Sequence, residues 1–139
     1  MQQGIPLEIF ESILKDLEHG NNCMDEKSYM QAFNFYSDAL DKVPKEKEDW
    51  HISLDIYYAL GESSFYQEEY NMAIYFFNKA LLSPDGLASW KVWFGLGKCF
   101  HKQNLKKEAQ DAFIRAYMLE GKEIFNENKE YIKMIQDFF

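Results

Sequence analysis

The stretch WFGLGKCFHKQNLKKEAQDAFIRAYML, residues 93–119, has a counterpart 36 positions earlier in the same chain. The matched pairs are Trp93 with Tyr57, Leu96 with Leu60, Gly97 with Gly61, Phe100 with Ser64, Ala109 with Ala73, Phe113 with Phe77 and Ala116 with Ala80. In every pair except Phe100 with Ser64, the two residues are identical or of the same chemical type. A weaker third copy, 41 positions before the second, contains Gly20, Ala32, Tyr36 and Ala39. Self-similarity at such a spacing is typical of proteins built from stacked repeats.

This pattern resembles the tetratricopeptide repeat (TPR), in which an aromatic residue, a Leu-Gly pair and a second aromatic mark the first helix, and Ala, Phe and Ala mark the second. The resemblance covers about residues 13–119 and is weakest in the first repeat, where Asp16 and His19 replace the usual aromatic and Leu. It implies an all-α fold in a single domain over 1–139, a TPR-like α-solenoid of three helix-turn-helix repeats plus a C-terminal capping helix. The repeats are expected at about 13–46, 54–85 and 90–121.

Six helices follow from this register, roughly at 7–22, 26–43, 50–67, 69–82, 87–103 and 105–119. The two spacings exceed the family's usual 34 residues, and we place the surplus in loops at KEKEDW (45–50) and PDGLAS (84–89). Asp85 or Ser83 is expected to cap the helix that enters Trp90.

Small residues should allow the two helices of a repeat to approach each other closely. We expect Gly61 or Gly97 to oppose the region of Ala73 or Ala109, with aromatic rings filling the remaining gaps.

After Gly121, the segment KEIFNENKEYIKMIQDFF (122–139) carries a broad apolar stripe without the Leu-Gly signature. Because the last repeat of a solenoid leaves one face uncovered, we expect residues 122–137 to form a seventh, capping helix. The alternative is an exposed apolar edge, including Phe138 and Phe139, through which the chain forms a homo-oligomer or binds a partner.

The net charge of −8 at pH 7 argues against non-specific binding to nucleic acid or to anionic membranes, and favours a basic protein partner. The charge is uneven, since residues 48–85 carry seven acids and one lysine, whereas residues 86–139 carry nine bases and seven acids. No apolar run of about 18 residues and no signal-like N-terminus is present, so a cytoplasmic protein is expected. Two cysteines do not make a disulfide framework.

Cysteine and histidine occur close together twice. Cys99 and His101 are two residues apart, which on a helix separates their directions by about 200°, so they cannot readily join one site. We expect Cys99 to be a small core residue. His19 and Cys23 share a helix face, but a zinc site needs three or four ligands. We therefore expect no catalytic residues, no metal and no cofactor, and so no enzyme.

In tetratricopeptide proteins the first helices of successive repeats line a concave groove. The resemblance places there Leu17, Asn21 and Asp25 from the first repeat, Asp55, Tyr58, Glu62 and Tyr66 from the second, and Lys91, Phe94, Lys98, His101 and Lys102 from the third. Such a groove would run from acidic to basic with aromatic anchors between, which suits recognition of a protein or peptide. The alternative is an ordinary solvated surface.

Two functions compete for such a module. The tail RAYMLEGKEIFNENKEYIKMI (115–135) resembles the ending of small bacterial tetratricopeptide proteins that accompany polymorphic toxins. This implies an immunity protein that neutralises a basic toxin domain by occlusion. The alternative is a secretion chaperone of the class II type III kind, or a generic adaptor, that holds an extended peptide in the groove.

A third subtype of the family clamps the C-terminal carboxylate of heat-shock chaperones. Only Asn21 and Lys91 match its pattern, whereas Leu17, Ala59 and Gly95 stand where the clamp needs polar or basic groups. That activity is not expected here.

Overall fold

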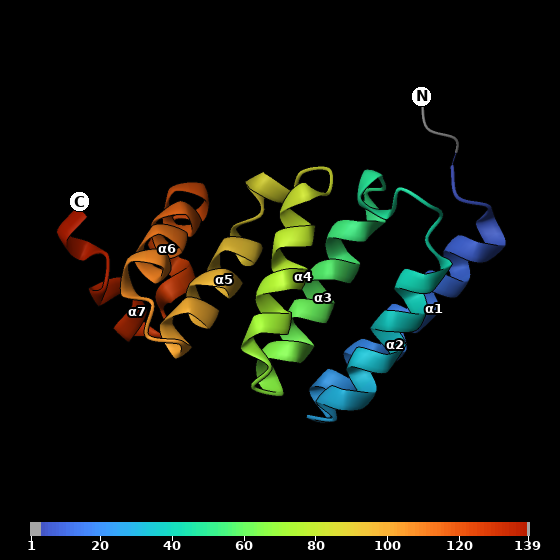
Figure 1. Ribbon diagram of the computed structural model, residues 1–139, viewed down its shortest axis with the longest axis horizontal. Helices are drawn as coiled ribbons and strands as arrows, with labels where there is room; N and C mark the ends of the chain where they lie inside the picture. The colour runs from blue at the N-terminus through green and yellow to red at the C-terminus, as the bar shows by residue number, and fades with distance from the viewer. Residues whose placement is uncertain (1–3, 139) are drawn as a thin grey trace.

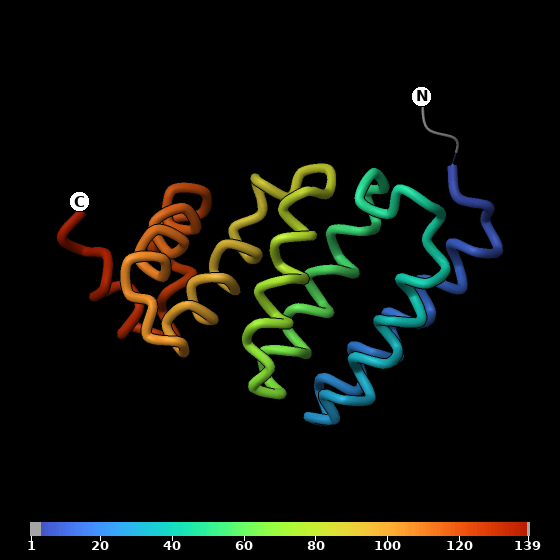
Figure 2. The backbone as a smooth tube through the Cα atoms, viewed as in Figure 1, coloured from blue at the N-terminus to red at the C-terminus, as the bar shows by residue number. Residues whose placement is uncertain are grey.

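The computed structural model describes residues 4–138, which form helices and no strands. The long helices are α1 (Leu7–Asp25), α2 (Tyr29–Lys42), α3 (Ile52–Tyr66), α4 (Tyr70–Leu82), α5 (Trp90–Lys102) and α6 (Lys106–Glu120). They form three antiparallel pairs stacked along one direction, with α1 and the C-terminal segments at opposite ends (Figures 1 and 2). All six predicted helices are present, with ends that differ from the predicted ones by a few residues.

Within each pair, a glycine of the first helix faces an aromatic ring of the second. The pairs are Gly20 with Tyr36, Gly61 with Phe77 and Gly97 with Phe113. A Cβ atom at Gly61 would lie 2.5 Å from the ring of Phe77, closer than real Cβ atoms approach their neighbours. We expected the glycines to oppose the region of Ala73 or Ala109. The ring that faces each glycine lies one turn after that alanine, because a ring fills the hollow that a missing side chain leaves.

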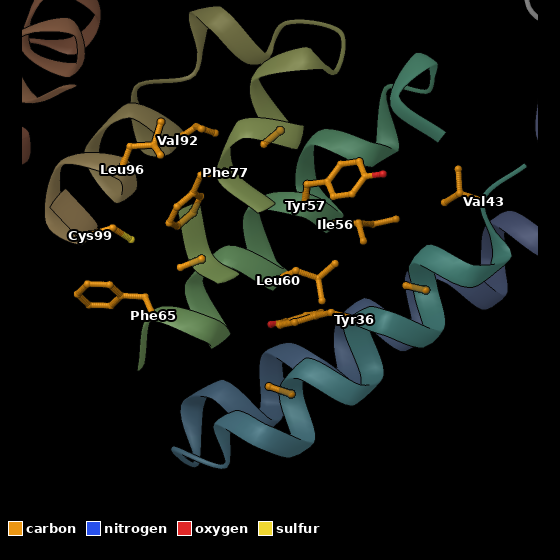
Figure 3. Packing of buried hydrophobic residues seen from close by; sticks show 14 of the residues in the cluster. Tyr36, Val43, Ile56, Tyr57, Leu60, Phe65, Phe77, Val92, Leu96 and Cys99 are labelled. Carbon is orange, nitrogen blue, oxygen red and sulfur yellow. The ribbon is translucent and has the colours of Figure 1, made fainter. Parts of the chain in front are cut away.

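One buried apolar cluster joins the successive pairs, and a second joins the third pair to the C-terminal segments. Phe77 of α4 is fully buried and lies between two glycines, because a Cβ at Gly95 of α5 would also meet its ring, at 2.6 Å. Figure 3 shows Tyr36 of α2 lying beneath Leu60 of α3, and Cys99 of α5 in the same buried layer. A ring thus meets a glycine between the second and third repeats, as it does within each repeat.

The two inserts between repeats hold short turns of 3₁₀-helix, η1 (Lys47–Asp49) and η2 (Gly86–Ala88). A residue with positive φ, Glu46 or Asp85, precedes each turn. The prediction that Asp85 or Ser83 caps the N-terminus of α5 is wrong. Ser89 occupies the N-cap position without a side-chain hydrogen bond, and Ser83 donates its hydroxyl hydrogen to the carbonyl of Lys79. The 3₁₀ turn, rather than a capping side chain, sets the direction in which α5 begins.

The C-terminal cap is present but is not one helix over 122–137. It consists of η3 (Lys122–Phe125), α7 (Lys129–Lys133) and η4 (Gln136–Phe138). Gly121 has φ 95°, a conformation that favours glycine, and it separates the cap from α6. The asparagines at 126 and 128 favour turns over continued helix, so the chain bends between η3 and α7. Phe138 is 59% exposed, and Phe139 lies outside the described residues.

Candidate partner-binding groove

The first helices of the repeats border a groove made of two hollows. One, of about 420 Å³, lies over α1 and α3, and its lining includes Leu17, Asn21, Asp25, Asp55, Tyr58 and Glu62. The other, of about 410 Å³, lies over α3, α5 and the cap, and its lining includes Tyr58, Glu62, Lys91, Phe94 and Lys98. Because Tyr58 and Glu62 border both hollows, the two form one continuous groove.

The N-terminal half of the groove is acidic. Asp25 and Asp55 are exposed along it, and among residues 4–138 no lysine or arginine lines this hollow. On its floor, the Tyr36 hydroxyl donates a hydrogen bond to Oδ1 of Asn21 at 2.6 Å. Burial, and then the negative charges nearby, raise the pKa of Tyr36 to about 12, so this hydroxyl stays a neutral donor.

Tyr58 and Glu62 form the centre of the groove. Burial raises the pKa of the Tyr58 hydroxyl well above its usual value, and the carboxylate of Glu62 raises it further. Glu62 also forms an ion pair with Lys98 at 3.7 Å. The side chain of Glu62 is 18% exposed and that of Lys98 is 14% exposed. The centre therefore offers a partner a ring flanked by a carboxylate that is already paired.

Lys98 is held by aromatic rings as well as by Glu62. Its Nζ lies 4.7 Å from the ring centre of Phe65 and 5.7 Å from those of Tyr66 and Phe94. Rings attract a cation most strongly where water is excluded, which is the case here. The charge of Lys98 is thus already paired within the molecule. Lys98 is therefore less available to a partner than the sequence analysis expected.

Phe94 is a core ring rather than an open anchor. Only 9% of its surface is exposed, and it packs edge-on against Phe113, Phe125 and Tyr131 at 5.4–5.8 Å. The last two belong to the cap. The ring expected to contact a partner therefore holds the C-terminal cap in place, with only its edge on the groove.

Three of the predicted groove residues line neither hollow. Tyr66 is 45% exposed and stacks on Tyr29 of α2 at 5.0 Å, beyond the floor of the groove. His101 is exposed and has its ring 5.5 Å from Tyr131 of the cap, and Lys102 is exposed at the end of α5. The structure thus brings together nine of the twelve residues that the resemblance placed in the groove, without these three.

The cap supplies lining residues that the sequence analysis missed. Besides Trp90 of α5, five cap residues border the C-terminal hollow: Glu123, Ile124, Asn126, Glu127 and Asn128. No motif marks them, because their place depends on the bend of the chain after Gly121. The regular spacing of the apolar tail residues was the available signal, and it indicated only that the tail packs against the last repeat.

These residues change the expected charge of the groove. Its C-terminal half holds Lys91 and Lys98, but also Glu123 and Glu127. The groove as a whole has five carboxylates (Asp25, Asp55, Glu62, Glu123 and Glu127) and two lysines in its lining. The expected change from acidic to basic is therefore wrong: the groove is acidic at one end and mixed at the other.

Cys99 and His101 do not join one site. Cys99 is fully buried, and burial raises the pKa of its thiol to about 12, which keeps it protonated and unreactive. The ring of His101 points to the cap instead. Within residues 4–138, no three His, Cys, Asp or Glu side chains gather as they would around a metal ion. No helix of the same range is long and apolar enough to cross a bilayer.

Several solved structures have a similar arrangement of helices. A TPR domain of OM64 from Arabidopsis superposes with a TM-score of 0.77 over 94% of this chain and 99% of its own, at 20% identity. The type III secretion chaperone SycD of Yersinia enterocolitica, solved with a peptide of the translocator YopD, gives 0.74 over 97% and 95%, at 15% identity. The chain has the tetratricopeptide-repeat fold.

A third TPR domain, the first of Spaghetti (RPAP3), solved with the HSP90 peptide SRMEEVD, superposes with a TM-score of 0.74 at 19% identity, over 92% of this chain and 94% of its own. Comparisons of the sequence with family models and with curated proteins find no match. The TPR fold is thus evident from three-dimensional structure and from the internal repeat, at identities too low to carry a function.

Proposed function

We propose that the chain is a non-enzymatic protein-binding module whose groove holds a partner segment rich in basic side chains. The observation that carries this proposal is the acidic lining of the groove: Asp25 and Asp55 are exposed on adjacent first helices, and no described lysine or arginine lines the same hollow. Charges at the rim of an interface steer a partner and select its sign, while rings such as Tyr58 supply apolar contact. Two of the similar TPR structures contain peptides, in RPAP3 and SycD.

The same lining disfavours an acidic C-terminal peptide of the kind seen with RPAP3. The peptide SRMEEVD ends in three residues of which two are Glu or Asp, and the groove would oppose them with carboxylates. Ala59 borders the N-terminal hollow as an apolar residue and supplies no positive charge. This agrees with the poor match to the carboxylate clamp in the sequence.

The test is selection of random peptides displayed on phage against the purified chain, followed by affinity measurement by fluorescence anisotropy. We expect the selected peptides to carry Lys or Arg next to an apolar residue. The variant D25K/D55K should weaken their binding by about tenfold or more, because two attractions become repulsions.

The matched control is D38K/D41K, which makes the same change of charge at exposed positions of α2, outside both hollows. It should bind the selected peptides as the wild type does, apart from a small general effect of net charge. Selection of acidic peptides, or equal loss of affinity in both variants, would remove the groove as the basis of recognition.

The finer proposal is a cytoplasmic immunity protein that neutralises a basic toxin domain by covering it. Its support is the tail resemblance and the negative lining of the groove. Co-expression with the product of the neighbouring gene tests it: the wild-type chain should rescue growth, and D25K/D55K should not. A neighbour that is not toxic, or toxicity that the wild type fails to relieve, would contradict it.

A secretion chaperone or adaptor is the second candidate. The observation in its favour is the superposition with SycD, which covers nearly the whole of both chains. In that case a short extended peptide should bind with the affinity of the full partner, whereas a toxin domain must be folded to present its surface. Comparison of native and urea-unfolded partner therefore separates the two functions.

A further inference from the structure

The C-terminal cap follows the register of the repeats, although it lacks their signature. Gly95 of α5 lies against a ring of α4, and 36 positions later Tyr131 stacks on a ring of α6 at 4.7 Å. Ile135 likewise lies 36 positions after Cys99, and both side chains are fully buried. The cap is therefore the first half of a fourth repeat, with a first helix and no second helix within the described residues.

A hollow on the cap marks the place where that second helix would lie. Between the second and third repeats, Leu81, Trp93, Leu96 and Phe100 border a hollow together with residues of α6. Their counterparts 36 positions later are Tyr117, Lys129, Ile132 and Gln136, and these line a hollow of about 400 Å³ that no described helix fills. We call this hollow the cap seat.

The cap seat is basic in a chain that is acidic overall. Lys122, Lys129 and Lys133 stand around its apolar floor, which includes Ile132. No ion pair between described residues involves these three lysines. A helix that fills the seat should therefore carry acidic residues beside an apolar stripe.

The first helix of the chain has that pattern on its open side. Leu7, Glu11, Leu14 and Glu18 recur at steps of four, three and four residues, which places them within an arc of about 60° on α1. All four are exposed, with Leu7 at 70% and Leu14 at 44%. Within the described residues, α1 packs extensively only against α2. We call these four residues the α1 stripe.

We propose that the cap seat of one molecule binds the α1 stripe of a second copy. Apolar side chains would meet at Leu14 and Ile132, and glutamates would face lysines on either side of that contact. The two surfaces lie at opposite ends of the molecule (Figure 1), so each copy offers one of each. Such an interface is heterologous, and repetition of it joins copies head to tail. The groove takes no part, so this proposal stands apart from the proposed function.

The direct test is sedimentation of the wild-type chain from micromolar to submillimolar concentration. We expect the average mass to rise with concentration at about 50 mM salt and to fall towards that of the monomer at about 1 M salt, because screening weakens pairs between exposed charges. K129E/K133E and E11K/E18K should each be monomeric, since in either variant the two surfaces carry the same sign.

Mixing the two variants is decisive. K129E/K133E retains an acidic stripe and E11K/E18K retains a basic seat, so the mixture should assemble again although neither variant does so alone. K102E/K106E, which reverses two lysines outside the seat, should behave as the wild type, and circular dichroism checks that all variants are folded. A wild-type chain that stays monomeric, assembly that persists in K129E/K133E, or a mixture that stays monomeric would overturn the proposal.

Discussion

At the scale of single residues, the fold depends on where glycines leave room for aromatic rings. Phe77 is buried between Gly61 and Gly95, which come from helices on either side of α4. The ring joins two repeats because both neighbours leave room for it. A side chain on either glycine would have to displace a ring that has no free space to move into.

We predict that Gly61→Ala lowers the free energy of unfolding by about 1–2 kcal/mol. Alanine favours a helix over glycine by about 1 kcal/mol, but forcing a methyl group into a packed core opposes this by about 1–3 kcal/mol. Because the ring is held on both sides, we expect the upper half of that range, which leaves the predicted net loss. Urea denaturation followed by circular dichroism measures the difference.

Gly4→Ala is the control for this substitution, because nothing lies within 4 Å of a Cβ at that position. It should leave stability within about 0.5 kcal/mol of the wild type. A Gly61→Ala chain as stable as the Gly4→Ala chain would show that the ring of Phe77 yields easily.

At the scale of elements, the C-terminal cap is the part that relies most on tertiary contacts. Isolated helices shorter than about 12 residues are marginal in water, and α7 has five residues. Tyr131 packs against Phe94 and Phe113, and Phe125 packs against the same two rings. This aromatic cluster keeps the short segments of the cap in place.

We predict that Tyr131→Ala lowers the free energy of unfolding by about 3–5 kcal/mol, the range for removing a large buried ring. Phe138→Ala, at an exposed position of the same cap, should change it by less than about 0.5 kcal/mol. Denaturation of both variants in urea is the measurement, and a similar small loss in the two would mean that the cap contributes little to the core.

The six long helices could be predicted from sequence because the same pattern of glycine, alanine and aromatic positions recurs in each repeat. Gly61 and Gly97 identify the same position in two repeats, and this fixes the helix faces and most of the groove, including Asp55, Tyr58 and Lys91. The cap could not be predicted in the same way. Its bend depends on the backbone after Gly121, and the burial of Phe94 follows from that bend.

At the scale of the whole molecule, several buried groups that lose a proton at high pH lie in different repeats. Burial raises the pKa of Tyr36 and of Cys99 to about 12 each, and raises that of Tyr58. In the unfolded chain these groups ionise near pH 9–10. Above that pH the unfolded state releases protons that the folded state retains, so unfolding becomes more favourable.

We predict that stability from these groups is fully present below about pH 9 and is lost as pH rises towards about 12. Urea midpoints at a series of pH values measure the slope. Tyr36→Phe, which removes one ionisable group, should be less stable at neutral pH, because the hydrogen bond to Asn21 is lost, and should show a shallower alkaline decline. An unchanged slope in this variant would exclude Tyr36 as a source of the decline.

The ring of Phe94 has a consequence for how tightly a partner is held. This ring borders the groove and also packs against Phe125 and Tyr131 of the cap, and Glu123 and Glu127 of the cap line the same hollow. A partner that contacts those glutamates binds only molecules in which the cap is docked, so part of its binding energy protects the cap's amide hydrogens from exchange with solvent. Affinity for the partner and fraying of the chain's end are therefore thermodynamically coupled.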